Sequence, residues 1–266
     1  MLKQRVLTAV FLAAALLTVL FALPEDVGVV LFGLLMLVGA WEWAALSGIS
    51  SPPARAAYTF ALALVIGLLA WIVPTGRMPE ALLWTQLAIW AGASVYLARF
   101  PVRIPAPVAA PAGLAILALA WLGLSFVLKS SALGPAWVLY LFLVVACADV
   151  GAFACGKLFG RVKLAPRVSP GKTWEGLIGG LAAVALAGVA GSWWFGQPAP
   201  ALVGMVLAVA GLSVVGDLSV SMLKRNAGLK DSGTLFPGHG RALDRIDSLL
   251  AAIPLFVLGL KWLSPA

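Results

Sequence analysis

Residues 112–128 read AGLAILALAWLGLSFVL, and this stretch contains no charged side chain. The hydrocarbon core of a bilayer is about 30 Å thick, and a helix needs about 20 mainly apolar residues to cross it. Backbone polar groups find no water there, so a spanning segment must satisfy its own hydrogen bonds. The stretch therefore predicts a transmembrane α-helix.

Nine apolar runs of this character follow one another along the chain. Short segments rich in Pro, Gly and charged residues, which favour turns, separate them. The runs are residues 6–22, 27–46, 56–73, 81–98, 112–128, 136–154, 175–195, 199–222 and 246–263. We predict an all-α bundle of about nine spans. Residues 1–130 form its N-terminal spans, and residues 131–266 form its C-terminal spans with the loops that carry the chemistry.

The composition excludes an ordinary soluble domain. Of the 266 residues, 62% are hydrophobic and 11% are charged, whereas soluble proteins average about 45–50% apolar and about 25% charged residues. The net charge of +8 fits basic loops on the cytoplasmic side of a membrane, so we expect no nucleic-acid partner. Cys147 and Cys155 lie in or beside one apolar run, which indicates packing residues rather than a disulfide or metal ligands.

The basic residues predict the orientation. With a cytoplasmic N-terminus, all of the 18 Lys and Arg residues except Arg77, Lys129 and Lys261 fall on the cytoplasmic side. Such an asymmetry is the usual signature of topology in a membrane protein. We therefore expect a multi-pass protein of a bacterial-type plasma membrane, with its N-terminus in the cytoplasm.

Carboxylates within or beside the spans gather at the cytoplasmic end. A charged group inside a span costs about 2.5–3.5 kcal/mol on insertion scales, so each is a candidate for function. Trp41 and Trp43 flank Glu42, which favours an interfacial position with a snorkelling side chain. Asp244 and Asp247 share a helix face, and two such carboxylates repel each other unless a cation or a basic group separates them. Their oxygen ligands suit Mg²⁺. The acids considered are Glu42, Asp149, Glu175, Asp217, Asp244 and Asp247.

Two polar segments carry most of the chemistry-bearing residues. Residues 160–176 contain Gly171-Lys172-Thr173, but Pro166 stands where a P-loop needs glycine and no strand is expected before it, so we reject that motif. A basic loop before a helix N-terminus remains, which is either a phosphate site or ordinary cytoplasmic charge. Residues 221–248 hold five basic residues, three acids and the single histidine, His239. Basic groups beside paired acids fit a triphosphate held with a metal ion.

The second segment resembles the signature of the phosphatidate cytidylyltransferases, also called CDP-diacylglycerol synthases. Residues 149–153, 169–176 and 216–218 resemble further family segments. Arg241 and Val220 depart from the pattern, which has a glycine and an acid there. The matching positions are Ser221, Lys224, Arg225, Lys230, Asp231, Gly233, Pro237, Gly238, His239, Gly240, Leu243, Asp244, Arg245 and Asp247.

The resemblance implies that CTP and phosphatidate react to give CDP-diacylglycerol and pyrophosphate. It implies Mg²⁺ as cofactor, with room for a second cation, and Asp217, Asp244 and Asp247 as its ligands. The expected catalytic residues are Lys224, Arg225, Lys230, Asp231 and His239. The expected substrate-binding residues are Ser169, Lys172, Ser221 and Arg245.

Two other functions also fit the sequence. One is a CTP-dependent enzyme for a different lipid, such as an ether-linked phosphatidate or a polyprenol. The other is a transporter of an anionic substrate, which should place its charges near the bilayer midplane and show repeat symmetry; the acids here gather at one face and we find no repeat. Gly176 and Gly180 form a GxxxG pattern that permits close helix packing within the chain or in a homodimer.

Overall fold

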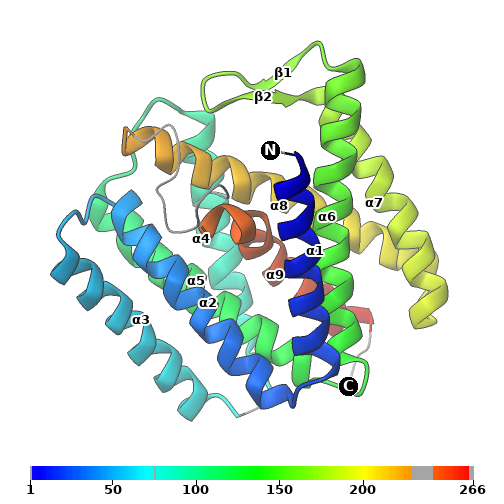
Figure 1. Ribbon diagram of the computed structural model, residues 1–266, viewed down its shortest axis with the longest axis horizontal. Coiled ribbons are helices and arrows are strands. Elements are labelled where there is room, and N and C mark those ends of the chain that lie inside the picture. The colour runs from blue at the N-terminus through cyan, green and yellow to red at the C-terminus, as the bar shows by residue number, and fades with distance from the viewer. Residues whose placement is uncertain (1, 75, 229–241, 264–266) are drawn as a thin grey trace.

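The computed structural model describes residues 2–74, 76–228 and 242–263, with side chains from Val10 onward. Within these residues the chain forms nine α-helices and one β-hairpin (Figure 1), which confirms the predicted all-α bundle. The elements are α1 (Leu2–Phe21), α2 (Glu25–Leu46), α3 (Pro52–Ile72), α4 (Glu80–Ala98), α5 (Ala106–Lys129), α6 (Gly134–Phe159), β1 (Lys163–Ala165), β2 (Ser169–Thr173), α7 (Trp174–Phe195), α8 (Ala199–Asn226) and α9 (Leu243–Leu263).

Eight of the described helices, α2 to α9, are long and apolar enough to cross a membrane. The part of α1 with described side chains, Val10–Phe21, is a shorter apolar helix. Large apolar side chains point outward, among them Trp71, Leu186 and Trp193, which are 83%, 73% and 84% exposed. Such a surface suits hydrocarbon rather than water.

Helices α5 and α9 are the most enclosed spans, whereas α3 lies at the edge of the bundle (Figure 1). Helix α9 packs against α4, α5, α6 and α8. Pro254 lies inside α9 and leaves the carbonyl of Leu250 without its helical partner. Gln86 of α4 donates its Nε2 to this carbonyl at 3.3 Å and to that of Ile116 in α5 at 3.4 Å. One buried amide thus joins three helices.

Two tryptophans, one on each helix, join α2 to α5 by the same kind of hydrogen bond. The indole of Trp43 lies where a side chain on Gly113 would stand, and its Nε1 donates to the carbonyl of Ala109 at 2.9 Å. The indole of Trp121 lies against Gly33, and its Nε1 donates to the carbonyl of Val29 at 3.0 Å. At Gly113 the missing Cβ gives the indole of Trp43 access to the helix backbone.

Helices α6 and α7 meet along a seam of small residues. A Cβ on Gly176 would stand 2.8 Å from the carbonyl oxygen of Ala152, and one on Gly180 would stand 2.7 Å from that of Ala148. The GxxxG pattern of α7 is therefore used within the chain, where it lets the two backbones approach each other. A homodimer, if it forms, must use another surface.

The segment before α7 differs from the predicted loop. Strands β1 and β2 pair antiparallel, with Lys163 opposite Thr173 and Ala165 opposite Ser169, and the hairpin projects from one end of the bundle (Figure 1). Strands this short, with Pro and Gly among them, have no clear alternation to identify them. Helix α8 continues to Asn226, so Ser221, Lys224 and Arg225 lie on a helix rather than in a loop.

We predict that Gly180→Ala lowers the thermal midpoint of the protein in detergent. Overpacking a tight contact costs about 1–3 kcal/mol, or roughly 2–4 °C per kcal/mol for a chain of this size. Gly204→Ala in α8 is the matched control, because a Cβ there meets nothing within 4 Å. That control should be neutral or slightly stabilising, since alanine is the better helix former. Equal midpoints for the two variants would show that the seam tolerates a methyl group.

Candidate functional site

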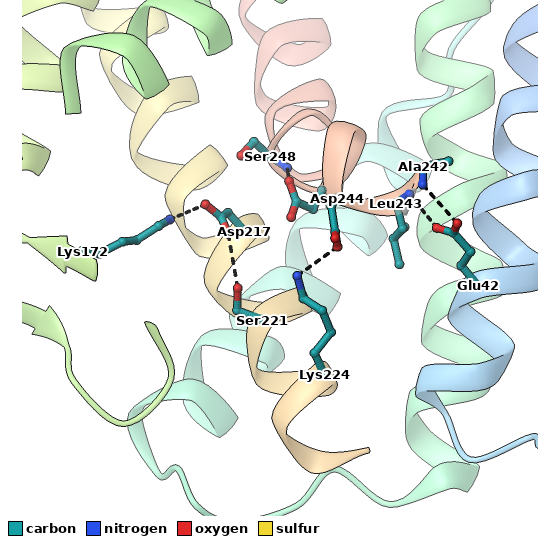
Figure 2. Close-up of polar contacts among 10 residues, drawn as sticks. Glu42, Lys172, Asp217, Ser221, Lys224, Ala242, Leu243, Asp244 and Ser248 are labelled. Atoms are coloured by element: carbon teal, nitrogen blue, oxygen red, sulfur yellow. Dashed lines mark hydrogen bonds and ion pairs between the residues drawn. The ribbon is translucent and has the colours of Figure 1, made fainter. Parts of the chain in front are cut away.

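One face of α8 carries three of the predicted residues. Asp217, Ser221 and Lys224 follow at intervals of four and three residues, which places them on one side of a helix. The hydroxyl of Ser221 donates to Oδ1 of Asp217 over 3.4 Å. Lys224 Nζ lies 2.9 Å from Oδ1 of Asp244 in the first turn of α9 (Figure 2). These contacts form a polar row between α8 and the start of α9.

Helices α8 and α9 cross closely at Gly216. A Cβ at this position would stand 2.5 Å from the carbonyl oxygen of Asp247 and 2.7 Å from the Cβ of Ala251. The glycine therefore lets α9 approach the turn of α8 that carries Asp217. Asp247 is 6% exposed, and its Oδ1 accepts the backbone N–H of Ser248 at 2.7 Å. Asp217 and Asp247 interact electrostatically as neighbouring carboxylates.

The β-hairpin supplies a second cation to the same row. Lys172 Nζ lies 2.5 Å from Oδ2 of Asp217 (Figure 2). The hairpin is tied to α8 a second time, because Nε of Arg225 donates to the carbonyl of Val168 at 3.3 Å. Val168 itself is buried against Leu218 and Met222 of α8. The two polar segments of the sequence are therefore in direct contact.

A cavity of about 410 Å³ opens beside this row. Asp149, Ser169, Lys172 and Asp217 form the charged and hydroxyl part of its wall. Phe153, Leu164, Leu177 and Val214 are among the apolar residues that line the remainder. A larger cavity, of about 570 Å³, is lined by Arg77 and Lys261, residues predicted to lie at the opposite membrane face, and none of its described lining residues belongs to the predicted site.

Asp149 is a further site candidate, for which the sequence alone indicated no specific role. It lies on α6, borders the cavity and interacts electrostatically with both Asp217 and Lys172. The one sequence signal for Asp149 was its position among the acids at the cytoplasmic end of the spans. Glu175, from the same group of acids, is used differently: both of its carboxylate oxygens accept the N–H of Val162, at 3.1 and 3.2 Å, which secures the hairpin to α7.

The predicted snorkelling of the Glu42 side chain toward the membrane surface is wrong. Its side chain is 3% exposed, and its carboxylate oxygens accept the backbone N–H groups of Ala242 and Leu243 at 3.0 and 2.7 Å (Figure 2). The flanking tryptophans suggested a membrane-interface belt, but Trp43 is itself buried against α5. Local sequence cannot distinguish these cases, since the partner of Glu42 lies 200 residues away.

Several predicted positions lie outside the described residues: Lys230, Asp231 and His239, together with Arg241. Arg245 is described and lies on the exposed side of the first turn of α9, between Asp244 and the buried Asp247. The structure therefore brings together Lys172, Asp217, Ser221, Lys224, Asp244 and Asp247, with Ser169 on the wall of the adjoining cavity.

The donor chemistry of the row fits Mg²⁺. Within the described residues, no group of three or more acid, histidine or cysteine side chains converges closely enough to hold a metal ion on its own. Lysine ammonium groups contact two of the acids, Asp217 and Asp244. Mg²⁺ is usually held by one or two carboxylates while waters and substrate phosphates complete the shell, and neighbouring carboxylates such as Asp217 and Asp247 meet that requirement.

Comparisons with known proteins identify the family of the chain. The phosphatidate cytidylyltransferase of Pseudomonas aeruginosa is 42% identical over 98% of this chain and 97% of its own length. That of Haemophilus influenzae is 37% identical over 96% of this chain and 97% of its own, and that of Brucella suis is 34% identical over 97% and 92%. The model of the "Cytidylyltransferase family" matches residues 3–263. The chain therefore belongs to the cytidylyltransferase family.

Proposed function

We propose that this protein is an integral membrane phosphatidate cytidylyltransferase, which converts CTP and phosphatidate to CDP-diacylglycerol and pyrophosphate. The observation that carries the proposal is the row of alternating cations and carboxylates, Lys172–Asp217 and Lys224–Asp244, beside a mainly apolar cavity. Such a row suits two anionic substrates, one from water and one from lipid. Membership of the family, with relatives of this name, favours the enzyme over an anion transporter.

The cavity supports a division of labour between the substrates. Its apolar wall, which includes Phe153 and Leu177, suits the lipid body of phosphatidate. Its polar wall, with Ser169 and Lys172, suits the phosphate. Lys224 of the row suits the phosphates of CTP, and Ser221 supplies a hydroxyl. Arg225, whose Nε contacts the carbonyl of Val168 in the hairpin, stays a predicted contributor. Ammonium and guanidinium groups bind phosphate oxygens through charge-assisted hydrogen bonds.

The reaction needs no protein nucleophile. A phosphate oxygen of phosphatidate attacks the α-phosphorus of CTP, a new P–O–P bond forms, and the bond between the α- and β-phosphates breaks to release pyrophosphate. Positioning and charge stabilisation supply most of the catalysis in such transfers. Lys172 and Lys224 lie at the acids before substrate arrives. Both ammonium groups are on flexible stems that can turn toward phosphate oxygens.

We propose Mg²⁺ as the cofactor, held by Asp217, Asp244 and Asp247 together with phosphate oxygens. When bound, the ion neutralises charge on the triphosphate and the leaving pyrophosphate. The support is the carboxylate chemistry of the α8–α9 crossing. Lys230, Asp231, His239 and Arg245 stay predicted contributors, as does a second cation. A homodimer and the absence of a nucleic-acid partner also stay predictions.

The direct test is an assay of purified protein with radiolabelled CTP, phosphatidate and Mg²⁺, in which label should move into the lipid phase. Asp244→Asn and Asp247→Asn should each reduce turnover by about 10²–10³-fold, the usual loss when one preorganised electrostatic contact is removed. Asp26→Asn is the matched control, because Asp26 is an exposed acid paired with Lys129 outside the row. Wild-type protein that transfers no label would refute the proposed function, and an active Asp247→Asn variant would remove that residue from the metal site.

The two lysines should behave as parts of one site. Lys172→Ala and Lys224→Ala are each expected to lose about 2–4 kcal/mol of transition-state stabilisation. The double variant should be little worse than the poorer single variant, because groups that act as a unit are non-additive. Lys261→Ala, which removes a lysine paired with Glu80, should leave kcat/KM unchanged. If the free-energy losses of the two single variants simply add, or if Lys172→Ala has normal activity, the hairpin is not part of the site.

We also propose that the site faces the cytoplasm, on the strength of the basic residues concentrated at that side. Ser51 and Ser131 are both exposed and are predicted on opposite sides of the membrane. In a variant without Cys147 and Cys155, Ser131→Cys should react with an impermeant thiol reagent added to intact cells, whereas Ser51→Cys should react only after lysis. The reverse pattern would invert the topology.

A further inference from the structure

The N-terminus of α9 receives its cap from a distant helix. The first N–H groups of a helix have no intrahelical partners, and a Ser, Thr, Asp or Asn directly before the helix usually accepts one of them. The residue at that place is Ala242, which has no acceptor in its side chain. Instead, Oε1 of Glu42 accepts from Ala242 N at 3.0 Å and Oε2 accepts from Leu243 N at 2.7 Å (Figure 2).

The surroundings of Glu42 stabilise the negative charge of its carboxylate. A buried ionised group is costly unless it is hydrogen-bonded, and Glu42 is 3% exposed. Here each carboxylate oxygen has a backbone donor. The positive end of the α9 dipole adds further stabilisation for a negative charge. A glutamine is a poorer substitute, because its amide NH₂ would face one of the two backbone N–H groups.

The neighbouring residue, Trp43, also fixes the position of Glu42 relative to α5. The adjacent Trp43 packs against Gly113 and donates its Nε1 to the carbonyl of Ala109 in α5 at 2.9 Å. Helix α2 therefore cannot slide along α5 without losing this contact. The carboxylate is a fixed point in the bundle rather than the mobile end of a long side chain.

The helix start held by Glu42 carries two proposed metal ligands. Asp244 lies in the first turn of α9 and contacts Lys224, and Asp247 follows three residues later against the crossing at Gly216. A shift or fraying of this turn moves both carboxylates relative to Asp217 and Lys224. Small displacements of this kind matter, since misplacing reacting groups by 1 Å costs about 10²-fold in rate.

We infer that Glu42 is a positioning residue for the reaction, because its carboxylate sets where α9 begins and thereby where Asp244 and Asp247 stand. The inference rests on the proposed function. It assigns to a helix of the N-terminal half, outside the motif segments, a direct part in the geometry of the site.

The test compares Glu42→Gln with wild type by two independent measurements. Amide hydrogen exchange over residues 242–247 should become about tenfold faster or more, the scale of a lost hydrogen bond to a charged group. In the cytidylyl-transfer assay, kcat should fall about 10–100-fold. The half-saturating Mg²⁺ concentration should rise by at least about threefold, because the metal ligands are displaced. The KM for phosphatidate should stay within about twofold, because the cavity wall is unaltered. Glu80→Gln is the matched control, since it removes a carboxylate whose partner, Lys261, lies outside the row.

The outcomes separate the two proposals. An inactive wild type refutes the proposed function and leaves the exchange measurement to judge the cap. An active wild type with unchanged exchange and unchanged Mg²⁺ dependence in Glu42→Gln overturns the positioning role. A fall in kcat alone, in proportion to the folded fraction, also overturns it. If Glu42→Gln does not fold, Glu42→Asp replaces it, because the shorter acid keeps the charge and should shift both readouts less in the same direction. Aggregation of both variants would make Glu42 a folding determinant instead.

Discussion

The site geometry depends on the close crossing of α8 and α9 at Gly216. Its missing side chain lets the backbone of Asp247 approach the turn that bears Asp217, so carboxylates from two helices share one small volume. Like charges repel strongly in a medium of low dielectric. The surrounding lysines offset that repulsion: Lys172 arrives from the hairpin and Lys224 from α8 itself. The hairpin, the helix crossing and the polar row are therefore one electrostatic unit.

The ion pairs at Asp217 and Asp244 are placed so that substrate can replace one partner by another. Removing two charges from water costs several kcal/mol per ion, and a pair regains that energy only with good geometry. The pairs at Asp217 and Asp244 are only partly buried, with side-chain exposures of 20–28%. Water and substrate can therefore compete for the lysines. A triphosphate with its cation offers each partner a replacement, since the acids gain a cation and the lysines gain an anion.

The sequence was informative where one physical effect dominates. Hydropathy predicted the helices because lipid imposes the same demand on every span, and the acids of α8 and α9 were found because charge within a span is exceptional. Tertiary contacts were harder to predict. The hairpin at residues 163–173 has strands of only three and five residues. Glu42 resembled an interfacial acid because its neighbours are tryptophans, and only the fold shows that α9 begins above it.

The amide of Gln86 has a consequence for how the bundle is assembled in the membrane. Helix α9 follows α4 in the chain, and Pro254 leaves α9 with an unmatched carbonyl at Leu250. An isolated α9 would expose that carbonyl to hydrocarbon, where an unsatisfied group costs several kcal/mol. Helix α4 precedes α9 in the chain and carries the complementary donor. Insertion of the later helix is then coupled to its docking, and a bundle lacking α4 would retain α9 poorly in the bilayer.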